Sequence, residues 1–253
     1  MADLALVRRL EEAALKGWPT LVTIADGAWV TRLAEGHTGR ANSLNMLDPE
    51  DGGDARRRLD ASVAAFRARN LPPLLRATPL TPPEAVTLAG RDGWRERGPS
   101  IVMSLDLDGL AADLGAATPP EARASDYWLR TMAAFMDFDE ARRAAIGRKL
   151  ERLAVDAGFF LSADRFGTPV ATTMAARDGD VVGLFEVGVE ASQRRQGHGE
   201  RIVTEALGWA KARGAHTAFL QVTASNHGAI ALYSRLGFVK RYGYRYLAPE
   251  GMG

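Results

Sequence analysis

Residues 193–214, QRRQGHGERIVTEALGWAKARG, combine residue types whose spacing points to ligand binding. Arg194 and Arg195 precede a Gly-His-Gly triplet at residues 197–199, and apolar residues then recur at helical spacing. Free backbone N–H groups at a helix start favour anions, and glycines allow a diphosphate to approach the backbone closely. The pattern predicts a site for a phosphorylated ligand, and a tight strand-to-helix turn with solvated arginines is the alternative.

Two common nucleotide motifs do not fit this stretch. A P-loop requires Gly-Lys-Ser/Thr after the glycines, and a Rossmann fingerprint requires a third glycine and an acidic residue on a later strand. The chain of 253 residues has a formal net charge of only +1, which creates no global field for nucleic acid or an anionic membrane. We therefore expect neither of these partners.

A second motif, NHGAIALYSRLGF, begins 27 residues after Gly199. Together the two motifs resemble those of the GNAT superfamily of acyl-CoA-dependent N-acyltransferases, V-x-x-x-x-R-x-x-G-x-G/A followed by N-x-x-A-x-x-L-Y-x-x-x-G-F. The resemblance covers residues 120–248, and Ala191 and His198 depart from it where proline and an aliphatic residue are usual. The matching residues are Val189, Arg194, Gly197, Gly199, Asn226, Ala229, Leu232, Tyr233, Gly237 and Phe238.

This resemblance implies a site for acetyl-CoA as co-substrate. In the family, the pantetheine arm pairs with the strand that here holds residues 187–189, and the pyrophosphate lies on the loop at residues 194–200. Asn226 and Tyr233 are seven residues apart, on one helix face and separated by roughly 10 Å, so both can touch one extended ligand. The expected cofactor-binding residues are Val187, Gly188, Val189, Arg194, Arg195, Gln196, Gly197, His198, Gly199, Glu200, Asn226, Ala229 and Tyr233.

The expected catalytic residues are Tyr233 and Glu186. Tyr233 resembles the general acid of the family, and a phenol of pKa about 10 can protonate or stabilise a leaving thiolate of pKa about 8.5. A packed core tyrosine is the alternative. Glu186 interrupts an apolar segment from Val181 to Val189, on the strand where family enzymes often carry a base that acts through water. A carboxylate paired with a neighbouring arginine is the alternative.

Several other polar side chains are not expected to take part in catalysis. The imidazoles of His198 and His227 are candidate acid–base groups, but both stand at expected helix starts, where surface imidazoles are common, and we interpret them as spectators in catalysis. Residues 137–140, DFDE, are read as a helix start, so we expect no metal. The chain has no cysteine, which excludes a thiolate nucleophile and fits direct transfer without a covalent enzyme intermediate.

The elements that must position these residues form two similar series. The fold class expected is α/β, with two tandem GNAT-like domains, each a mixed, mostly antiparallel sheet flanked by helices. The Ala/Gly/Pro-rich segment 113–125 is the expected boundary between domains at 1–115 and 120–253. Helices are expected over 4–17, 54–69, 81–94, 125–156, 199–214 and 226–235, and strands over 20–26, 27–36, 39–47, 73–78, 98–107, 158–164, 168–176, 180–189, 217–222 and 237–247.

The first half is expected to lack the cofactor site. When the two halves are aligned on Gly93-Trp94 and Gly237-Phe238, Tyr233 falls on Ala89 and Asn226 on Pro82. The segment that would bind phosphate reads DPEDGGD, whose carboxylates repel a diphosphate. This half resembles the degenerate half of tandem bacterial acyltransferases. Its polar run, which either faces a ligand or only pairs strands between the halves, consists of Arg40, Asn42, Ser43 and Asn45.

The predicted activity is transfer of an acetyl group to a primary amine of a small molecule. Acetylation of a protein or peptide amine, or a CoA-binding sensor without turnover, are the alternatives. The N-terminal segment carries charges every few residues, unlike a signal peptide or membrane span, so we expect a cytoplasmic monomer or homodimer. Four aromatic residues indicate either that the acetyl acceptor carries an apolar or aromatic group or only that they pack in the core. They are Tyr127, Trp128, Phe135 and Phe138.

Overall fold

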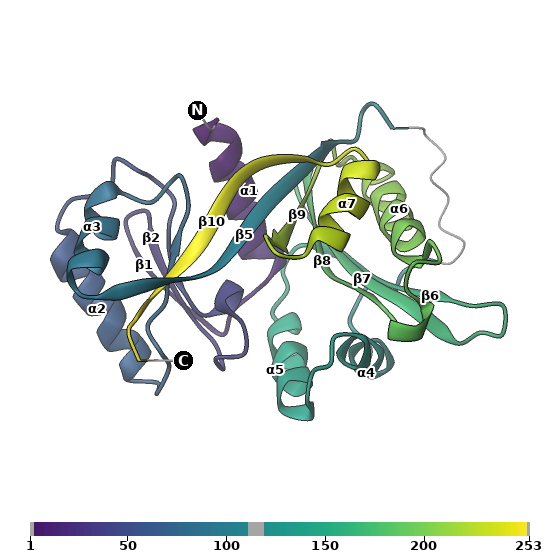
Figure 1. Ribbon diagram of the computed structural model, residues 1–253, viewed down its shortest axis with the longest axis horizontal. Coiled ribbons are helices and arrows are strands. Elements are labelled where there is room, and N and C mark those ends of the chain that lie inside the picture. The colour runs from purple at the N-terminus through teal and green to yellow at the C-terminus, as the bar shows by residue number, and fades with distance from the viewer. Residues whose placement is uncertain (1–2, 111–118, 252–253) are drawn as a thin grey trace. The chain divides into compact units, whose positions relative to one another are not determined.

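The computed structural model describes residues 3–110 and 119–251, which form two compact units (Figure 1). The first unit holds the described residues up to Val102, then Val222–Asn226 and those from Arg241 on. The second holds the described residues of Met103–Gln221 and His227–Lys240. The expected domain boundary at 113–125 lies partly outside the described residues. Neither unit is one continuous stretch of chain, and the division into domains 1–115 and 120–253 stays a prediction.

The first unit is a sheet with three helices. Its strand order is β1-β2-β3-β4-β10-β5, antiparallel except for the parallel contact of β3 with β4 among the registers described. Asp3 caps the first helix, since its Oδ1 accepts from the N–H groups of Ala5 and Leu6, both at 3.1 Å. The elements are α1 (Leu4–Gly17), β1 (Val22–Asp26), β2 (Trp29–Leu33), η1 (Gly39–Ala41), β3 (Leu44–Met46), α2 (Ala55–Arg67), β4 (Leu75–Ala77), α3 (Pro83–Arg91), β5 (Trp94–Asp106) and β10 (Val239–Pro249).

The two faces of this sheet differ in chemistry. Leu75 and Ala77 of β4 belong to an apolar core shared with α2 and α3. Arg76, between them, points to the other face, where its Nη2 lies 2.8 Å from Oε1 of Glu11 on α1. The Tyr242 hydroxyl of β10 donates to the same oxygen at 2.7 Å. Helix α1 and the last strand are therefore joined to β4 by a buried polar cluster.

The polar run of the first half supports the local backbone. The Asn42 Oδ1 accepts from the Ala34 N–H at 2.7 Å, and the Ser43 hydroxyl donates to the Gly39 carbonyl at 2.8 Å. The Asn45 Nδ2 donates to the Ser43 carbonyl at 2.8 Å. All three side chains are buried. These contacts all lie within residues 34–45, so the three side chains are engaged by the local backbone of the first unit.

The second unit is a layered sheet whose strand order is β5-β9-β8-β7-β6. Helices α4 and α6 pack against β6, β7 and β8, on opposite sides of these strands in Figure 1. No helix in the described ranges is long and apolar enough to cross a membrane. The elements are α4 (Asp126–Phe135), α5 (Glu140–Leu150), β6 (Asp156–Ala163), β7 (Pro169–Asp178), β8 (Val181–Val189), η2 (Ala191–Gln193), α6 (His198–Lys211), β9 (Thr217–Thr223) and α7 (His227–Arg235).

The α/β class, the mixed sheet and the order of elements are as expected, but the sheet partners are not consecutive in the chain. The last strand, β10, pairs with β4 of the first unit, with Arg245 opposite Ala77. The end of β5 belongs to the second unit, where the Leu107 N–H donates to the His216 carbonyl at 2.9 Å. An alternating apolar pattern identifies a strand and its buried face but does not identify its neighbour.

Candidate active site

The strand β8 carries a bulge at the expected catalytic glutamate. On the neighbouring strand β7, Thr172 pairs with Gly188 and Met174 with Phe185, so Thr173 lies opposite two residues, Glu186 and Val187. The parallel register of β8 with β9 runs from Val181 and Thr217 to Leu184 and Leu220, ahead of the bulge. The bulge therefore begins where this parallel register ends.

Glu186 adopts an unusual backbone conformation at this bulge. Its φ is 49°, in the left-handed region that disfavours residues with a side chain by about 1–3 kcal/mol. The side chain is 8% exposed, which agrees with the expected position in an apolar segment. Two hydroxyls hold the adjoining carbonyls: Thr173 donates to Phe185 at 3.1 Å and Thr172 to Glu186 at 3.3 Å. Neither threonine was identified from the sequence, because the register that creates the bulge leaves no motif.

The loop after β8 turns sharply into α6. The Glu190 carboxylate accepts from the Gln193 N–H at 3.1 Å and from the Ser192 hydroxyl at 2.5 Å, and the hydroxyl lowers the pKa of that carboxyl. Arg195 and Gly197 then have φ values of 64° and 84°. The N-cap residue of α6 is Gly197, which makes no side-chain cap hydrogen bond to the N–H groups of the first turn.

The two glycines of the loop have different surroundings. A Cβ on Gly197 would meet nothing within 4 Å, so only the left-handed backbone requires glycine there. A Cβ on Gly199 would lie 3.2 Å from Leu232 of α7 and 3.4 Å from Val189 of β8. Gly199 therefore allows close packing of β8, α6 and α7, whereas the space above Gly197 is open.

The charged residues of the loop lie at the surface. The Arg194 Nε donates to the Val189 carbonyl at 3.3 Å, which turns this side chain back toward the end of β8. The Gln196 amide donates to the Ser192 carbonyl at 3.3 Å. The Glu200 carboxylate lies 4.0 Å from Arg235 of α7. The first turn of α6 thus carries a carboxylate that is itself paired with an arginine.

Helix α7 holds the second motif, with Tyr233 buried at 6% exposure. Burial raises the pKa of the phenol to about 12, and its ring centroid lies 5.9 Å from that of Phe238. Asn226 is exposed and lies one residue before the helix, so it is not part of the helix face as expected. Ala229 is half-buried on the first turn.

The connection between α4 and α5 lies against the end of β8. A Cβ on Gly188 would come 3.3 Å from Phe135 and Met136 and 3.2 Å from the Thr172 hydroxyl. Of the four aromatic residues expected near an acceptor, Trp128 is fully buried, and its indole N–H donates to the Phe160 carbonyl at 3.1 Å. Tyr127 is 56% exposed. Phe135 lies beside Gly188 of β8, and the Arg142 guanidinium lies over the Phe138 ring, 3.6 Å from its centroid.

The two histidines and the acidic segment occupy helix starts as interpreted. His198 is half-buried as the first residue of α6, and His227 is exposed as the first residue of α7. Asp139 caps α5 by accepting from the Arg142 N–H at 2.8 Å. Within residues 3–110 and 119–251, no group of three or more His, Asp or Glu side chains could hold a metal ion.

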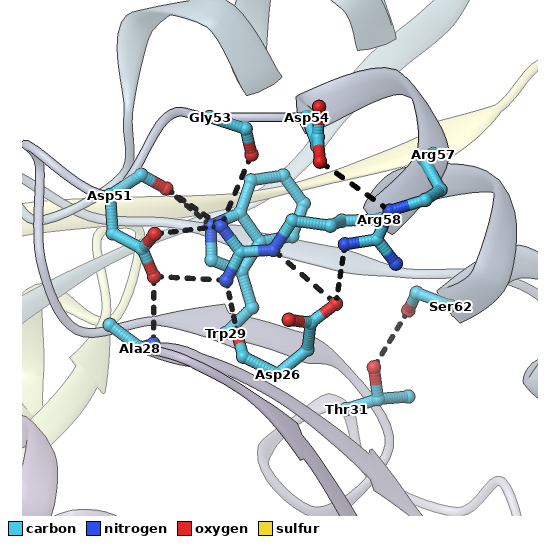
Figure 2. A network of polar contacts seen from close by, with 10 residues as sticks. All are labelled: Asp26, Ala28, Trp29, Thr31, Asp51, Gly53, Asp54, Arg57, Arg58 and Ser62. Atoms are coloured by element: carbon cyan, nitrogen blue, oxygen red, sulfur yellow. Dashed lines mark hydrogen bonds and ion pairs between the residues drawn. The ribbon is translucent and has the colours of Figure 1, made fainter.

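The acidic loop of the first unit, residues 48–54, forms ion pairs with arginines of α2 (Figure 2). The Asp51 carboxylate accepts from both terminal nitrogens of Arg58, at 2.8 and 2.9 Å, and from the Ala28 N–H at 2.7 Å. Arg58 also lies over the Trp29 ring, 4.5 Å from its centroid. The hydrogen bonds from Arg58 lower the pKa of Asp51. This carboxylate is largely neutralised within the unit, so simple repulsion of a diphosphate describes the loop incompletely.

The helix after this loop starts like α6 in one respect. Asp54 precedes α2 with a φ of 53° and makes no side-chain cap, as Gly197 precedes α6. The Asp54 carboxylate lies 3.8 Å from Arg57. The two helix starts share a left-handed residue but differ in charge.

Comparisons with known proteins agree with this arrangement. The family model described as "Probable histone acetyltransferase Rv0428c C-terminal" matches residues 4–247. The "Uncharacterized N-acetyltransferase YobR" of Bacillus subtilis is 25% identical over 249 residues, which cover 94% of this chain and 98% of the relative. The "Mycothiol acetyltransferase" of Thermobispora bispora is 31% identical over 159 residues, or 58% of this chain and 53% of that protein.

Solved structures show the same fold. A GCN5-related N-acetyltransferase from Kribbella flavida superposes with a TM-score of 0.72 at 22% identity, covering 97% of this chain and 96% of the other. A tandem GNAT protein from the clavulanic acid biosynthesis pathway gives a TM-score of 0.66 at 14% identity, covering 100% of this chain and 89% of the other.

Proposed function

Because the chain belongs to the GNAT family of N-acetyltransferases, we propose that it transfers the acetyl group of acetyl-CoA directly to a primary amine of a small molecule. The observation that carries the proposal is the loop from β8 to α6. This loop joins the bulged strand β8 to the start of α6, which has no side-chain cap. At Gly199, β8 and α6 pack closely against α7, the helix that holds Tyr233.

The residues of this loop suit a diphosphate. The space above Gly197 admits a ligand, and the N–H groups of His198, Gly199 and Glu200 are the first of α6. Arg194 and Arg195 add positive charge at the surface. We assign pyrophosphate binding to residues 194–200 and pantetheine binding to the backbone of residues 187–189, and further cofactor contacts to Asn226 and Ala229 of the second motif.

The transfer needs one proton donor and one proton acceptor. The amine lone pair attacks the thioester carbonyl, a C–N bond forms and the C–S bond breaks. The departing thiolate takes a proton from the Tyr233 phenol, whose raised pKa keeps it protonated at neutral pH. Before the attack, Glu186 takes one proton from the substrate ammonium, directly or through water, and passes it to solvent, which leaves the free amine. After the attack, the nitrogen of the adduct releases its second surplus proton to solvent. The phenolate regains a proton from solvent before the next turnover.

A peptide amine is the second candidate acceptor. The Escherichia coli "[Ribosomal protein bS18]-alanine N-acetyltransferase" is 41% identical over 59 residues, which is 23% of this chain. That similarity is confined to a short stretch, whereas similarity to the YobR protein extends over nearly the whole chain. A CoA-binding sensor that lacks turnover is the third candidate.

We further propose that the chain is a tandem of two GNAT-like halves, of which only the second binds the cofactor. Both halves run through strands, a helix, a strand, a helix and a long final strand in the same order. In the first half, Ala89 stands at the position of the Tyr233 phenol and Pro82 at the position of the Asn226 amide. Ala89 is fully buried in the apolar core, so that position holds no group able to reach a ligand.

The test is a screen of amines with acetyl-CoA. Release of free CoA thiol is followed for small aliphatic and aromatic amines and for peptides with different N-termini, and each product is identified by its added acetyl mass. Rapid acetylation of a small amine supports the proposal. Turnover with peptides alone would favour the second candidate, and tight CoA binding without any turnover would favour the sensor.

A further inference from the structure

The bulge of β8 is held by two side chains of β7. Thr172 and Thr173 donate to the carbonyls of Glu186 and Phe185, at 3.3 and 3.1 Å. Adjacent residues of a strand point to opposite faces of the sheet, so the two hydroxyls hold consecutive carbonyls from opposite sides. Both threonines are 0% exposed, and water does not compete for either bond.

This arrangement offsets an unfavourable backbone conformation. Glu186 has a φ of 49° without being glycine, and a bulge displaces carbonyls from the regular ladder. Without the two threonine hydrogen bonds, we expect the backbone of β8 to return to a more favourable conformation by shifting the residues after the bulge. Those residues are Val187, Gly188 and Val189, the segment that binds pantetheine in the proposed function.

We propose that Thr172 and Thr173 are positioning residues that hold the β8 bulge and thereby align the acetyl group for attack. This inference rests on the proposed function, because it takes the backbone after the bulge as the donor site. The two threonines act through β8 and do not contact the reacting atoms. A Cβ at position 188 would lie 3.2 Å from the Thr172 hydroxyl, so Thr172 also limits which residue can replace Gly188.

Valine replaces threonine with almost the same shape and removes only the hydroxyl. Thr172→Val and Thr173→Val are tested singly, so that poor folding of one leaves the other informative. Thr172→Ser and Thr173→Ser keep the donor and should restore most of the activity. The matched control is Thr31→Val in the first unit, because Thr31 is also buried and its hydroxyl donates to Ser62 at 2.9 Å (Figure 2).

We expect each valine variant in β7 to lower kcat roughly 10- to 100-fold, because small misplacements of reacting groups have effects of that size. The dissociation constant for CoA should change far less, since the diphosphate site at α6 is intact. Thr31→Val should lose a similar amount of thermal stability and keep its kcat. Equal kcat values for all three valine variants, or serine variants as slow as the valine variants, would overturn the proposal.

Amide hydrogen exchange separates this proposal from the proposed function. The N–H groups of residues 185–189 should exchange faster in the two β7 valine variants than in Thr31→Val, with no substrate present. If the wild-type chain acetylates no amine, the proposed function fails while this comparison still tests the bulge. If exchange at 185–189 is the same in all three variants, the threonines do not hold the bulge, whatever the activity.

Discussion

Burial of the Tyr233 phenol determines the pH range over which it can donate a proton. With a pKa raised to about 12, the group stays protonated throughout the range in which the enzyme can be assayed. Activity should therefore show no alkaline decline caused by this residue. The same burial makes the phenol a weaker acid, so it contributes more by hydrogen bonding to the developing thiolate than by complete early transfer.

Replacement of Tyr233 by phenylalanine tests this role. We expect kcat to fall by roughly 10- to 1000-fold with CoA affinity almost unchanged, because only the proton donor is lost. Steady-state kinetics and calorimetry with CoA measure the two effects. Tyr242→Phe is the control, since it removes another buried phenol, one that donates to Glu11 in the first unit. It should lower thermal stability and leave kcat near the wild-type value. A Tyr233→Phe variant with unchanged kcat at saturation would exclude the acid role.

Glu186→Gln tests the base. If Glu186 takes the amine proton, the substitution should remove the acidic limb of the pH profile of kcat/KM and lower its plateau. Glu205→Gln is a matched control, because Glu205 is also buried and burial raises the pKa of its carboxyl, but it lies in the middle of α6. It should leave the profile unchanged. An acidic limb that persists with the same apparent pKa in Glu186→Gln would assign deprotonation to water or to the amine itself.

The sequence identifies the residues that make up the two motifs but carries no information on what surrounds them. The glycines were interpreted together as a phosphate cradle, because their spacing carries no information on what lies beside them. Only the packed structure separates open Gly197 from Gly199, which packs against Leu232. Thr172 and Thr173 gave no signal at all, since two threonines on a strand are typical of any sheet.

Helix α6 has a left-handed glycine at each end, which allows a controlled test of the diphosphate site. Gly197 and Gly214 have φ values of 84° and 82°, and neither would place a Cβ within 4 Å of another atom. Alanine at either position should cause a similar backbone strain and a similar loss of thermal stability. Only Gly197→Ala should weaken CoA binding, by roughly 10-fold or more, because it moves the first N–H groups of the helix. Equal CoA affinities for the two variants would place the diphosphate elsewhere.

The acidic loop before α2 should control the stability of the first unit at low pH. Arg58 lowers the pKa of Asp51 below its ordinary value of 3.8, so the interaction stabilises the folded state above that pH. Its contribution is lost as the pH falls through the lowered pKa. Thermal unfolding measured from pH 6 to pH 2 should show a lower melting temperature for Asp51→Asn at pH 6 and a difference from wild type that shrinks below about pH 4. A constant difference across this range would contradict the linkage.

The elements of the chain were predicted well, whereas their partners in the sheet were not predicted. Amphipathic periodicity and glycine-rich turns are local signals, so helices such as α2 and strands such as β7 and β8 appear close to their expected ranges. The pairing of β10 with β4 joins residues far apart in sequence, and the alternating pattern of β10 is the same whichever strand lies beside it. The bulge at Glu186 has the same origin, since register is a property of two strands.

The composition of each unit has a consequence for truncation. Residues from Arg241 on belong to the first unit, where Tyr242 bonds to Glu11 and Leu247 lies in the apolar core. Truncation of the chain after Lys240 should therefore destabilise the first unit, even though the removed residues follow the second motif in the sequence. Exchange protection of the amides of β4 is the direct measurement. Protection equal to that of the full chain would show that β10 is dispensable for the first unit.

The complete chain should bind one molecule of CoA. The helix start at α2 has a left-handed residue like that at α6, but its surroundings are acidic: a Cβ on Gly52 would lie 2.6 Å from the Glu84 carboxylate, and Asp54 replaces the glycine. A diphosphate there would meet carboxylates, and the arginines nearby are paired, Arg56 with Asp92 at 2.7 Å and Arg57 with Asp54 at 3.8 Å.

Calorimetry with CoA measures this stoichiometry directly. The wild-type chain should bind one equivalent, and Gly197→Val should bind none, because a branched side chain strains the left-handed backbone and occupies the open space above the loop. Asp54→Val is the matched substitution at the start of α2, and it should retain one full equivalent with unchanged affinity. Two equivalents in the wild type would give each unit a cofactor site, and one equivalent remaining in Gly197→Val but lost in Asp54→Val would assign the cofactor to the first unit.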